Sequence, residues 1–385
     1  GKSVAIGKTA TATGLRSMAF GQSYANGIDS FAACIGSTST SLGALSTNSV
    51  AMGKSAKAEG TRSAAIGDEA VTGTSGESAV ALGTSHANGV DSFAAAGNSS
   101  SATYGATGNY SVSVGYSSKA THLYTVCLGG PQNIAGDDRA AVLGGTQNEA
   151  HSYGAVVVGG VDNIIVDAST SGPTANYSAI LGGQDNILKN TYSVILGGED
   201  NLNFGHSSAI TGSYNTIASD ASHSFAHGFY AYSRIYGSRV QASGRFATGG
   251  DAQGGQYIFR AATTDATATV LTTNNSATIS ASNVLSANTQ FSTDSKCITF
   301  SGTIVAMQNS AQSYGSWEIK GLLVKASGST TLANSAITVI SNTSSWGLAL
   351  SADNTNNALT IQVTGEASHN IRWVANIQTS EVTYV

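Results

Sequence analysis

A short apolar phrase recurs over about the first 249 residues and predicts a series of short strands. It appears first as Ser3-Val4-Ala5-Ile6-Gly7 and returns at 17–21, 49–53, 63–67 and 78–83. Larger apolar residues alternate with a small one, which is the period of two of a β-strand. Gly, Asn, Ser and Thr, which favour turns, separate the copies. Strand, turn, second extended piece and turn together predict one coil of a parallel β-roll or β-helix.

The glycine that closes each phrase sets the length of a coil, which is 14 to 16 residues at most steps. Equivalent residues of successive coils should therefore stack about 4.8 Å apart, with backbone hydrogen bonds along the stack. We expect each coil to bury one pair of larger apolar side chains, such as Val4 and Ile6. The longest step predicts an extra loop at 167–177. The landmark glycines are Gly7, Gly21, Gly36, Gly53, Gly67, Gly83, Gly97, Gly115, Gly129, Gly144, Gly159, Gly182, Gly197, Gly212, Gly228, Gly237 and Gly249.

The phrase and the residues after it, Ser3-Val4-Ala5-Ile6-Gly7-Lys8-Thr9-Ala10-Thr11-Ala12-Thr13-Gly14, resemble the head repeat of YadA-like trimeric autotransporter adhesins. The resemblance covers roughly residues 1–120, and a local duplication of 25–33 at 87–95 supports it. It implies a left-handed parallel β-roll with three chains side by side. An oligomer is also expected physically, because so thin a coil buries too few apolar side chains to offset its ordering entropy.

A second repeat begins near residue 125, in which two adjacent glycines are followed, after two further residues, by an asparagine. The small residue two places before the first glycine becomes Val or Ile, which indicates either a wider coil or a changed contact between chains. We expect the asparagines to stack as a hydrogen-bonded ladder. A cation site at Asp162, Asp185 and Asp200 is the less favoured alternative. The ladder residues are Asn133, Asn148, Asn163, Asn186 and Asn201.

The repeat stops after Gly250-Asp251-Ala252-Gln253, and longer alternating runs follow. Turn-forming clusters bound each run, as in an antiparallel β-sandwich. The stretches 299–306, 317–321, 350–353 and 363–375 resemble a β-domain that ends many phage tail-fibre proteins. The whole chain is therefore predicted to be all-β, with β-roll repeats at 1–124, a second repeat region at 125–254 and a C-terminal sandwich at 255–385.

Binding residues are harder to choose. We interpret Trp317 and Trp373 as core, whereas Trp346 lies beside a polar run and is equally suited to a ligand. Loops on a rigid scaffold usually carry recognition, which favours the segments 309–314, 327–334, 342–346 and 353–357. The individual candidates are Tyr314, Trp346, Asn354 and Asn356.

Composition excludes several function classes. The net charge is −5 and the few Lys and Arg are dispersed, so we expect no nucleic-acid partner. No apolar run approaches about 18 residues, so membrane insertion is not expected. We interpret Cys34 and Cys127 as small core fillers and His227 as a hydrogen-bonded histidine, since the spacing of His223 and His227 has no metal-binding meaning on a strand. No metal or cofactor is predicted.

Acidic residues are too sparse to mark a catalytic pair. Glu318, Asp353 and Glu366 are the candidates within the C-terminal motifs, and nothing pairs two of them. We therefore expect no enzymatic activity, with a glycan-degrading tailspike as an alternative.

Together these observations predict a homotrimeric phage tail fibre, in which the β-roll is the shaft and the C-terminal domain is the tip. Its partners would be other tail or baseplate proteins and a glycan or protein of the host surface, and its location the virion. The first alternative is the head of a bacterial trimeric autotransporter adhesin. That class needs a heptad stalk and a membrane anchor, and we expect the chain to end naturally at Val385 without them.

Overall fold

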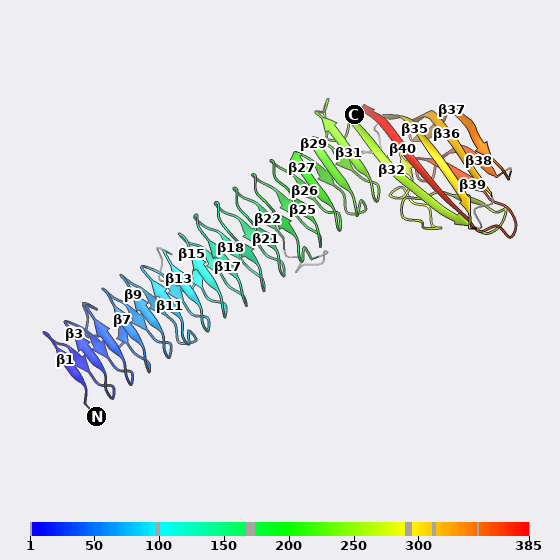
Figure 1. Cartoon of the computed structure of the whole chain (residues 1–385). Coiled ribbons are helices and arrows are strands. Elements are labelled where there is room, and N and C mark those ends of the chain that lie inside the picture. The colour runs from blue at the N-terminus through cyan, green and yellow to red at the C-terminus, as the bar shows by residue number, and fades with distance from the viewer. Residues whose placement is uncertain are drawn as a thin grey trace. The chain divides into compact units, whose positions relative to one another are not determined.

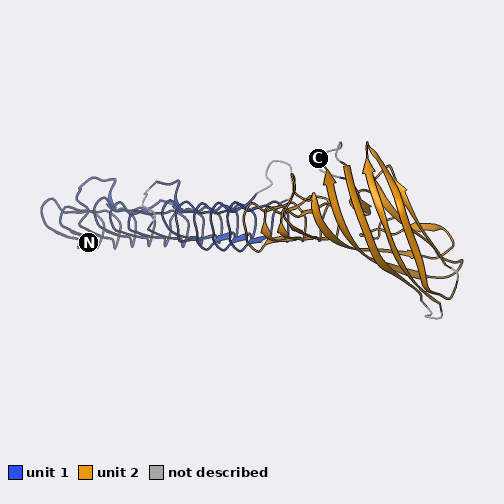
Figure 2. Ribbon diagram, turned by 90° about the horizontal axis from the view of Figure 1, so that it is seen from above, with its two compact units in different colours: residues 1–192 blue, residues 193–385 orange. Residues whose placement is uncertain are grey.

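The computed structural model describes residues 2–96, 101–166, 174–288, 295–309, 313–344 and 346–384. The chain divides into two compact units, Gly1–Tyr192 and Ser193–Val385 (Figure 2). Every named element of the described residues is a β-strand, which confirms the all-β prediction. Within these residues, no helix is long and apolar enough to cross a membrane.

Unit 1 consists of stacked coils, and each coil contributes one strand to each of two parallel sheets (Figure 1). The strands of the first sheet are β1 (Val4–Ile6), β3 (Met18–Phe20), β5 (Phe31–Ala33), β7 (Val50–Met52), β9 (Ala64–Ile66), β11 (Val80–Leu82), β13 (Phe93–Ala95), β15 (Val112–Val114), β17 (Val126–Leu128), β19 (Ala141–Val142), β21 (Val156–Val157) and β23 (Ala179–Ile180). Those of the second are β2 (Thr11–Ala12), β4 (Tyr24–Ala25), β6 (Gly43–Ala44), β8 (Lys57–Ala58), β10 (Val71–Thr72), β12 (His86–Ala87), β14 (Gly105–Ala106), β16 (Lys119–Ala120), β18 (Ile134–Ala135), β20 (Glu149–Ala150), β22 (Ile164–Ile165) and β24 (Ile187–Leu188).

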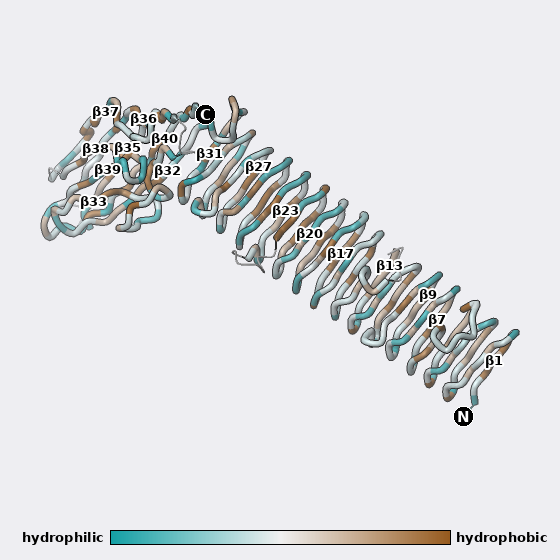
Figure 3. The backbone as a smooth tube through the Cα atoms, turned by 180° about the vertical axis from the view of Figure 1, so that it is seen from behind, coloured by the Kyte–Doolittle hydropathy of each residue, from teal (hydrophilic) through white to brown (hydrophobic). Residues whose placement is uncertain are grey.

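The register stacks equivalent residues of the phrase directly on one another, and it corrects our expectation about the interior. Val4 pairs with Met18, Ala5 with Ala19, and Ile6 with Phe20. The small middle residue points inward and is fully buried from Ala19 onward, whereas Val4 is 42% exposed and Ile6 55%. The interior is too narrow for the larger pair, so alternation places that pair on the outside. The apolar segments recur from coil to coil (Figure 3).

Larger side chains fill the interior of the coil in the second repeat. Val142, Val157 and Ile180 continue the inward column of the first sheet and are fully buried. Ile165 and Leu188 take the facing positions in the second sheet. Larger side chains therefore enter the coil from both sheets.

The corner glycines are required where coils stack closely. Gly7 and Gly53 have φ of +124° and +113°. A Cβ on Gly7 would lie 2.8 Å from Cα of Gly21, which leaves no room for a side chain. Gly21, Gly67, Gly83 and Gly115 follow equivalent strands, also with positive φ.

Two coils break this rule, because Cys34 and Ala96 take the corner position with positive φ, and the first of them overturns the prediction for Cys34. Ala32, and not Cys34, occupies the inward slot beside Ala51. Cys34 takes the corner position of a glycine, with φ of +58°, and is exposed. Gly36 therefore lies two residues beyond that corner, and Gly97 lies outside the described residues. Cys127 does fill the interior, where burial raises the pKa of its thiol to about 11.

Unit 2 begins with further coils and continues into antiparallel sheets. The coil strands are β25 (Val194–Ile195), β26 (Leu202–Asn203), β27 (Ala209–Ser213), β28 (Thr216–Ile217), β29 (Phe225–Phe229), β30 (Tyr232–Ser233) and β31 (Arg239–Ser243). The later strands are β32 (Ala252–Thr263), β33 (Ala268–Val270), β34 (Leu285–Ser286), β35 (Ser295–Gln308), β36 (Tyr314–Ala326), β37 (Ser329–Asn342), β38 (Gly347–Asp353), β39 (Ala358–Thr364) and β40 (Ile371–Tyr384).

The antiparallel part of unit 2 has two sheets around one core. The larger sheet has the order β32–β40–β35–β36–β37, and β39 pairs with β38, β33 and β34 in the smaller one. Phe259, Trp317 and Trp373 from the larger sheet pack with Leu359 and Ile361 from the smaller one. The last coil strand, β31, pairs antiparallel with β32, which joins the coils of this unit to the larger sheet.

Candidate functional site

Asparagines stack as a ladder through the second repeat of unit 1. Asn163 Nδ2 donates to Asn148 Oδ1 at 3.0 Å and to the carbonyls of Gly159 and Gly183 at 3.1 and 2.9 Å. Asn186 Nδ2 donates in turn to Asn163 Oδ1 at 2.8 Å. Asn133, Asn148, Asn163 and Asn186 are all fully buried. Each amide thus satisfies polar groups of its own coil and of the next one, which fixes the spacing of the stack.

The same arrangement recurs in unit 2, where Asn215 Nδ2 donates to Asn201 Oδ1 at 3.2 Å. Asn215 was not predicted because Thr211 takes the place of the first glycine, although the four-residue spacing from that position to the asparagine is kept. Asp162, Asp185 and Asp200 have positive φ at the turns before the ladder residues. Within the described residues, no three His, Cys, Asp or Glu side chains are grouped as metal ligands.

A row of aromatic side chains follows one corner of the unit 1 coils. Tyr110 stacks on Tyr124 with ring centroids 5.1 Å apart, and Tyr177 stacks on Tyr192 at 5.6 Å. These four tyrosines have positive φ and are exposed, although Asn or Asp would fit this backbone better. Their ring faces contact one another, so the row stabilises the corner. The sequence signal was a tyrosine directly before the Ser or Thr that precedes the strand in these four coils.

The motif Gly250-Asp251-Ala252-Gln253 closes the coils of unit 2. The buried Asp251 carboxylate accepts hydrogen bonds from the backbone N–H groups of Ala247 and Thr248 at 2.6 and 2.8 Å, and also from Phe246. Burial alone would raise the pKa of Asp251, but these bonds and Arg245 hold it below its usual value. Gln253 donates to the Tyr232 carbonyl at 3.1 Å and accepts from its N–H at 2.9 Å. Its amide thus replaces the strand of a further coil.

A buried ion pair joins this closure to the larger sheet. Lys296 Nζ lies 2.7 Å from Glu381 Oε2, and both side chains are almost fully buried. Glu381 also accepts hydrogen bonds from Tyr257, Thr379 and Gln253 at 2.9, 2.8 and 3.2 Å. Burial pushes the pKa of Glu381 upward, but Lys296 and the hydrogen bonds outweigh it and hold the pKa below its usual value. The carboxylate is therefore charged at neutral pH.

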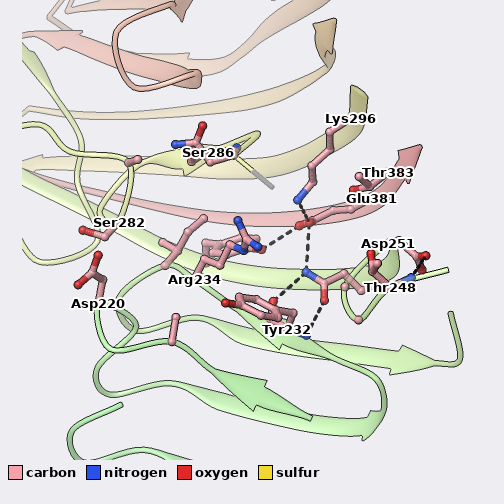
Figure 4. A pocket seen from close by; sticks show the side chains of 18 residues that line it. Asp220, Tyr232, Arg234, Thr248, Asp251, Ser282, Ser286, Lys296, Glu381 and Thr383 are labelled. Atoms are coloured by element: carbon pink, nitrogen blue, oxygen red, sulfur yellow. Dashed lines mark hydrogen bonds and ion pairs between the residues drawn. The ribbon is translucent and has the colours of Figure 1, made fainter. Parts of the chain in front are cut away.

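A cavity of about 330 Å³ lies over this ion pair, between the last coils of unit 2 and its antiparallel strands. Figure 4 shows Asp220 and Ser282 at one end and Lys296, Glu381 and Thr383 at the other. The lining comes from six separate stretches of sequence, and therefore no local motif marks it.

The predicted binding residues do not gather at this cavity. Tyr314 is exposed, and its N–H and carbonyl bond to Thr343 Oγ1. Trp346 is only 3% exposed and packs on Trp373 at 5.5 Å, so its ring is part of the core. Asn354 accepts a bond from the Thr330 N–H at 2.7 Å, and Asn356 donates to Asp353 at 2.7 Å, which assigns both amides to turns. Residues 310–312 and Ser345 of the predicted loops lie outside the described residues, as do 167–173 of the predicted extra loop.

The remaining candidates are also placed separately. Glu366 pairs with His369 at 3.1 Å, Asp353 accepts bonds within its turn, and Glu318 points to solvent from β36. The His227 ring stacks on Phe225 at 5.1 Å, and burial together with Arg239 lowers the pKa of its imidazole.

Comparison with known proteins identifies the repeat. A family profile described as the YadA head domain repeat matches residues 2–23, 44–70 and 106–130. A search of the curated proteins gives no match. Together with the stacked coils, the family match shows a YadA-like β-roll repeat protein.

Proposed function

We propose that this protein is a non-enzymatic, homotrimeric tail fibre of a phage, which binds the host cell surface and assembles with other tail or baseplate proteins in the virion. The observation that carries the proposal is the row of apolar side chains on the outside of the unit 1 coils. Contiguous exposed apolar surface of this kind marks interaction sites. The exposed residues include Val4, Ile6, Met18, Met52, Ile66, Leu143, Val158 and Leu181.

Two further copies of the chain are the partners that this row fits. It repeats at the coil spacing, so a chain with the same spacing presents a matching row along its whole length. Three copies packed around one axis would bury the row and supply the apolar contacts that the alanine-lined interior lacks. The C-terminal sheets have their own core, which leaves their surface available for binding a glycan or protein of the host.

A substitution in the apolar row tests the trimer. Ile66→Lys places a charge in the proposed interface and should reduce the mass in solution toward that of one chain. Asp68→Lys adds the same side chain two residues away, at an exposed turn, and should leave the mass unchanged. Equal masses for the two variants, both folded by circular dichroism, would count against this interface.

The location is tested with antibodies against the chain. Gold-labelled antibody should decorate the tails of virions made by the organism that carries the gene, and excess free protein should block adsorption of those virions. Binding to intact host cells measures the receptor function directly. Virions without label and cells without bound protein would contradict the proposal.

The head of a bacterial trimeric adhesin is the second candidate, and the matched YadA head repeat favours it. In that case the same antibody would decorate the outer surface of the bacterium that carries the gene, and leave virions unlabelled.

A further inference from the structure

We propose that the cavity over the Lys296–Glu381 pair binds a neutral sugar unit of a cell-surface glycan. This inference rests on the proposed surface-binding function and adds the place of contact and the ligand class. The cavity volume of about 330 Å³ lies at the lower end of the range of small-molecule sites, about 300–1,000 Å³. One or two sugar rings are ligands of that size.

The charges that line the cavity favour a neutral ligand over an ion. Glu381 is paired with Lys296 at 2.7 Å, and backbone N–H groups hold the carboxylate of Asp251. Asp220 and Arg234 also line the cavity and have opposite signs, so the lining as a whole favours neither an anion nor a cation. A ligand without net charge avoids the cost of burying a charge there.

The polar groups match a polyhydroxylated ligand, because each sugar hydroxyl both donates and accepts. Asp220 is an acceptor, and the hydroxyls of Ser282 and Thr383 can do either, although that of Ser282 also bonds to Ser280. The Ser286 hydroxyl is already held by the Asn356 carbonyl and the Asn288 N–H. The Lys296 ammonium has three N–H donors, and Glu381 is its only ion-pair partner within the described residues.

The same lining has an apolar side that a sugar ring also needs. Ala218, Ile235 and Ala281 come from the coil turns and the segment before β34. The ring of Tyr232 contributes less, because the Arg234 guanidinium lies 4.3 Å above it. The C–H face of a pyranose can pack on the aliphatic side while its hydroxyls reach Asp220 and Ser282.

A filling variant tests the cavity without disturbing the coil. Ala218 occupies the position that Phe204 holds one coil earlier, since the N–H groups of the two residues donate to equivalent carbonyls at 2.9 and 3.0 Å. The coil therefore accommodates Phe at this register, and Ala218→Phe should fold while it fills the cavity. Asp220→Ala removes an exposed acceptor, and Asp68→Ala is the matched control at an exposed turn of unit 1.

The experiment measures binding of the methyl glycosides of glucose, galactose, mannose and N-acetylglucosamine to the full chain by saturation-transfer NMR. Sodium galacturonate and inorganic phosphate are the charged comparators. At least one neutral glycoside should bind saturably. Asp220→Ala should weaken that binding about 10-fold, the effect of losing one hydrogen bond to a charged group. Ala218→Phe should abolish it, and Asp68→Ala should change nothing.

Several results would overturn the inference: no neutral glycoside binds, only the charged comparators bind, or Ala218→Phe binds like the unaltered chain. Binding of the chain to intact host cells tests the proposed function separately. If Ala218→Phe still binds to host cells, the cavity is not the place of contact, but the proposed surface-binding function stands. If the chain binds a glycoside saturably but does not bind to host cells, the cavity is a sugar site and the proposed function is wrong.

Discussion

The coils of unit 1 and the antiparallel sheets of unit 2 use the same backbone hydrogen bonds but different interiors. Alanine fills much of the coil interior, whereas Phe259, Trp317 and Trp373 fill the core between the sheets. The coils leave larger residues such as Ile6 and Met52 exposed. Burying an aromatic side chain removes far more apolar surface from water than burying alanine.

The two regions also differ in how far apart their paired residues lie in the sequence. Val4 pairs with Met18 in the coils, whereas Ala252 pairs with Val382 in the larger sheet. Coil stability is therefore close to a sum over neighbouring coils, while the sheets should fold as one cooperative unit. The sheets therefore carry their own core, whereas the coils leave their larger apolar side chains exposed, which supports the proposal that further chains cover them.

The largest expected effect is the loss of a core tryptophan from the sheets. Trp373→Ala should destabilise the antiparallel part of unit 2 by about 3–5 kcal/mol, because it opens a cavity and leaves Thr263 without its bond from the indole N–H. Urea unfolding followed by tryptophan fluorescence measures this. An unchanged free energy of unfolding would contradict the proposed difference between the two interiors.

The next effect concerns the buried ion pair. Glu381→Gln should cost roughly 3 kcal/mol at pH 7, since it leaves the Lys296 ammonium buried without its counter-charge.

The ion pair also predicts the direction of acid sensitivity. Because the folded-state pKa of Glu381 is lowered, its contribution is present above the usual glutamate pKa of 4.5 and is lost as pH falls through the folded value. The unaltered chain should therefore lose stability in acid more steeply than Glu381→Gln. Parallel pH profiles of the two unfolding free energies would contradict this assignment.

A smaller effect is expected in the coils. Asn163→Ala removes bonds to two carbonyls and to Asn148 and Asn186, and should lower coil stability by about 2 kcal/mol. Thermal unfolding by far-UV circular dichroism measures it. Asp162→Asn is the control, because Asn tolerates the positive φ of that turn. A calcium-dependent loss of stability in the control would instead favour the cation alternative.

The smallest effect separates two cysteines of the coils. At pH 8, a maleimide should label the exposed Cys34 within minutes and leave Cys127 unlabelled, since burial raises the pKa of its thiol to about 11. Mass spectrometry of peptides from the labelled protein distinguishes the two sites. Equal labelling would show that the coil interior opens on that timescale.

Sequence alone predicted the coils because each repeats a local pattern, and the alternation in 3–7 fixes the strand. It did not predict which alternating residues point inward, because that depends on the width of the coil. The shift at Cys34 was missed for a similar reason, since only the pairing of Ala32 with Ala51 reveals it. The cavity was beyond reach because Asp220, Lys296 and Glu381 are distant in sequence and come together only through long-range pairing.

We propose that two further copies of the chain cover the exposed apolar row of the coils. Sedimentation equilibrium of the full chain in dilute neutral buffer tests it most directly. We expect a single species with three times the chain mass of 38.7 kDa. A fully folded species of 38.7 kDa that stays monomeric as the concentration rises would contradict it.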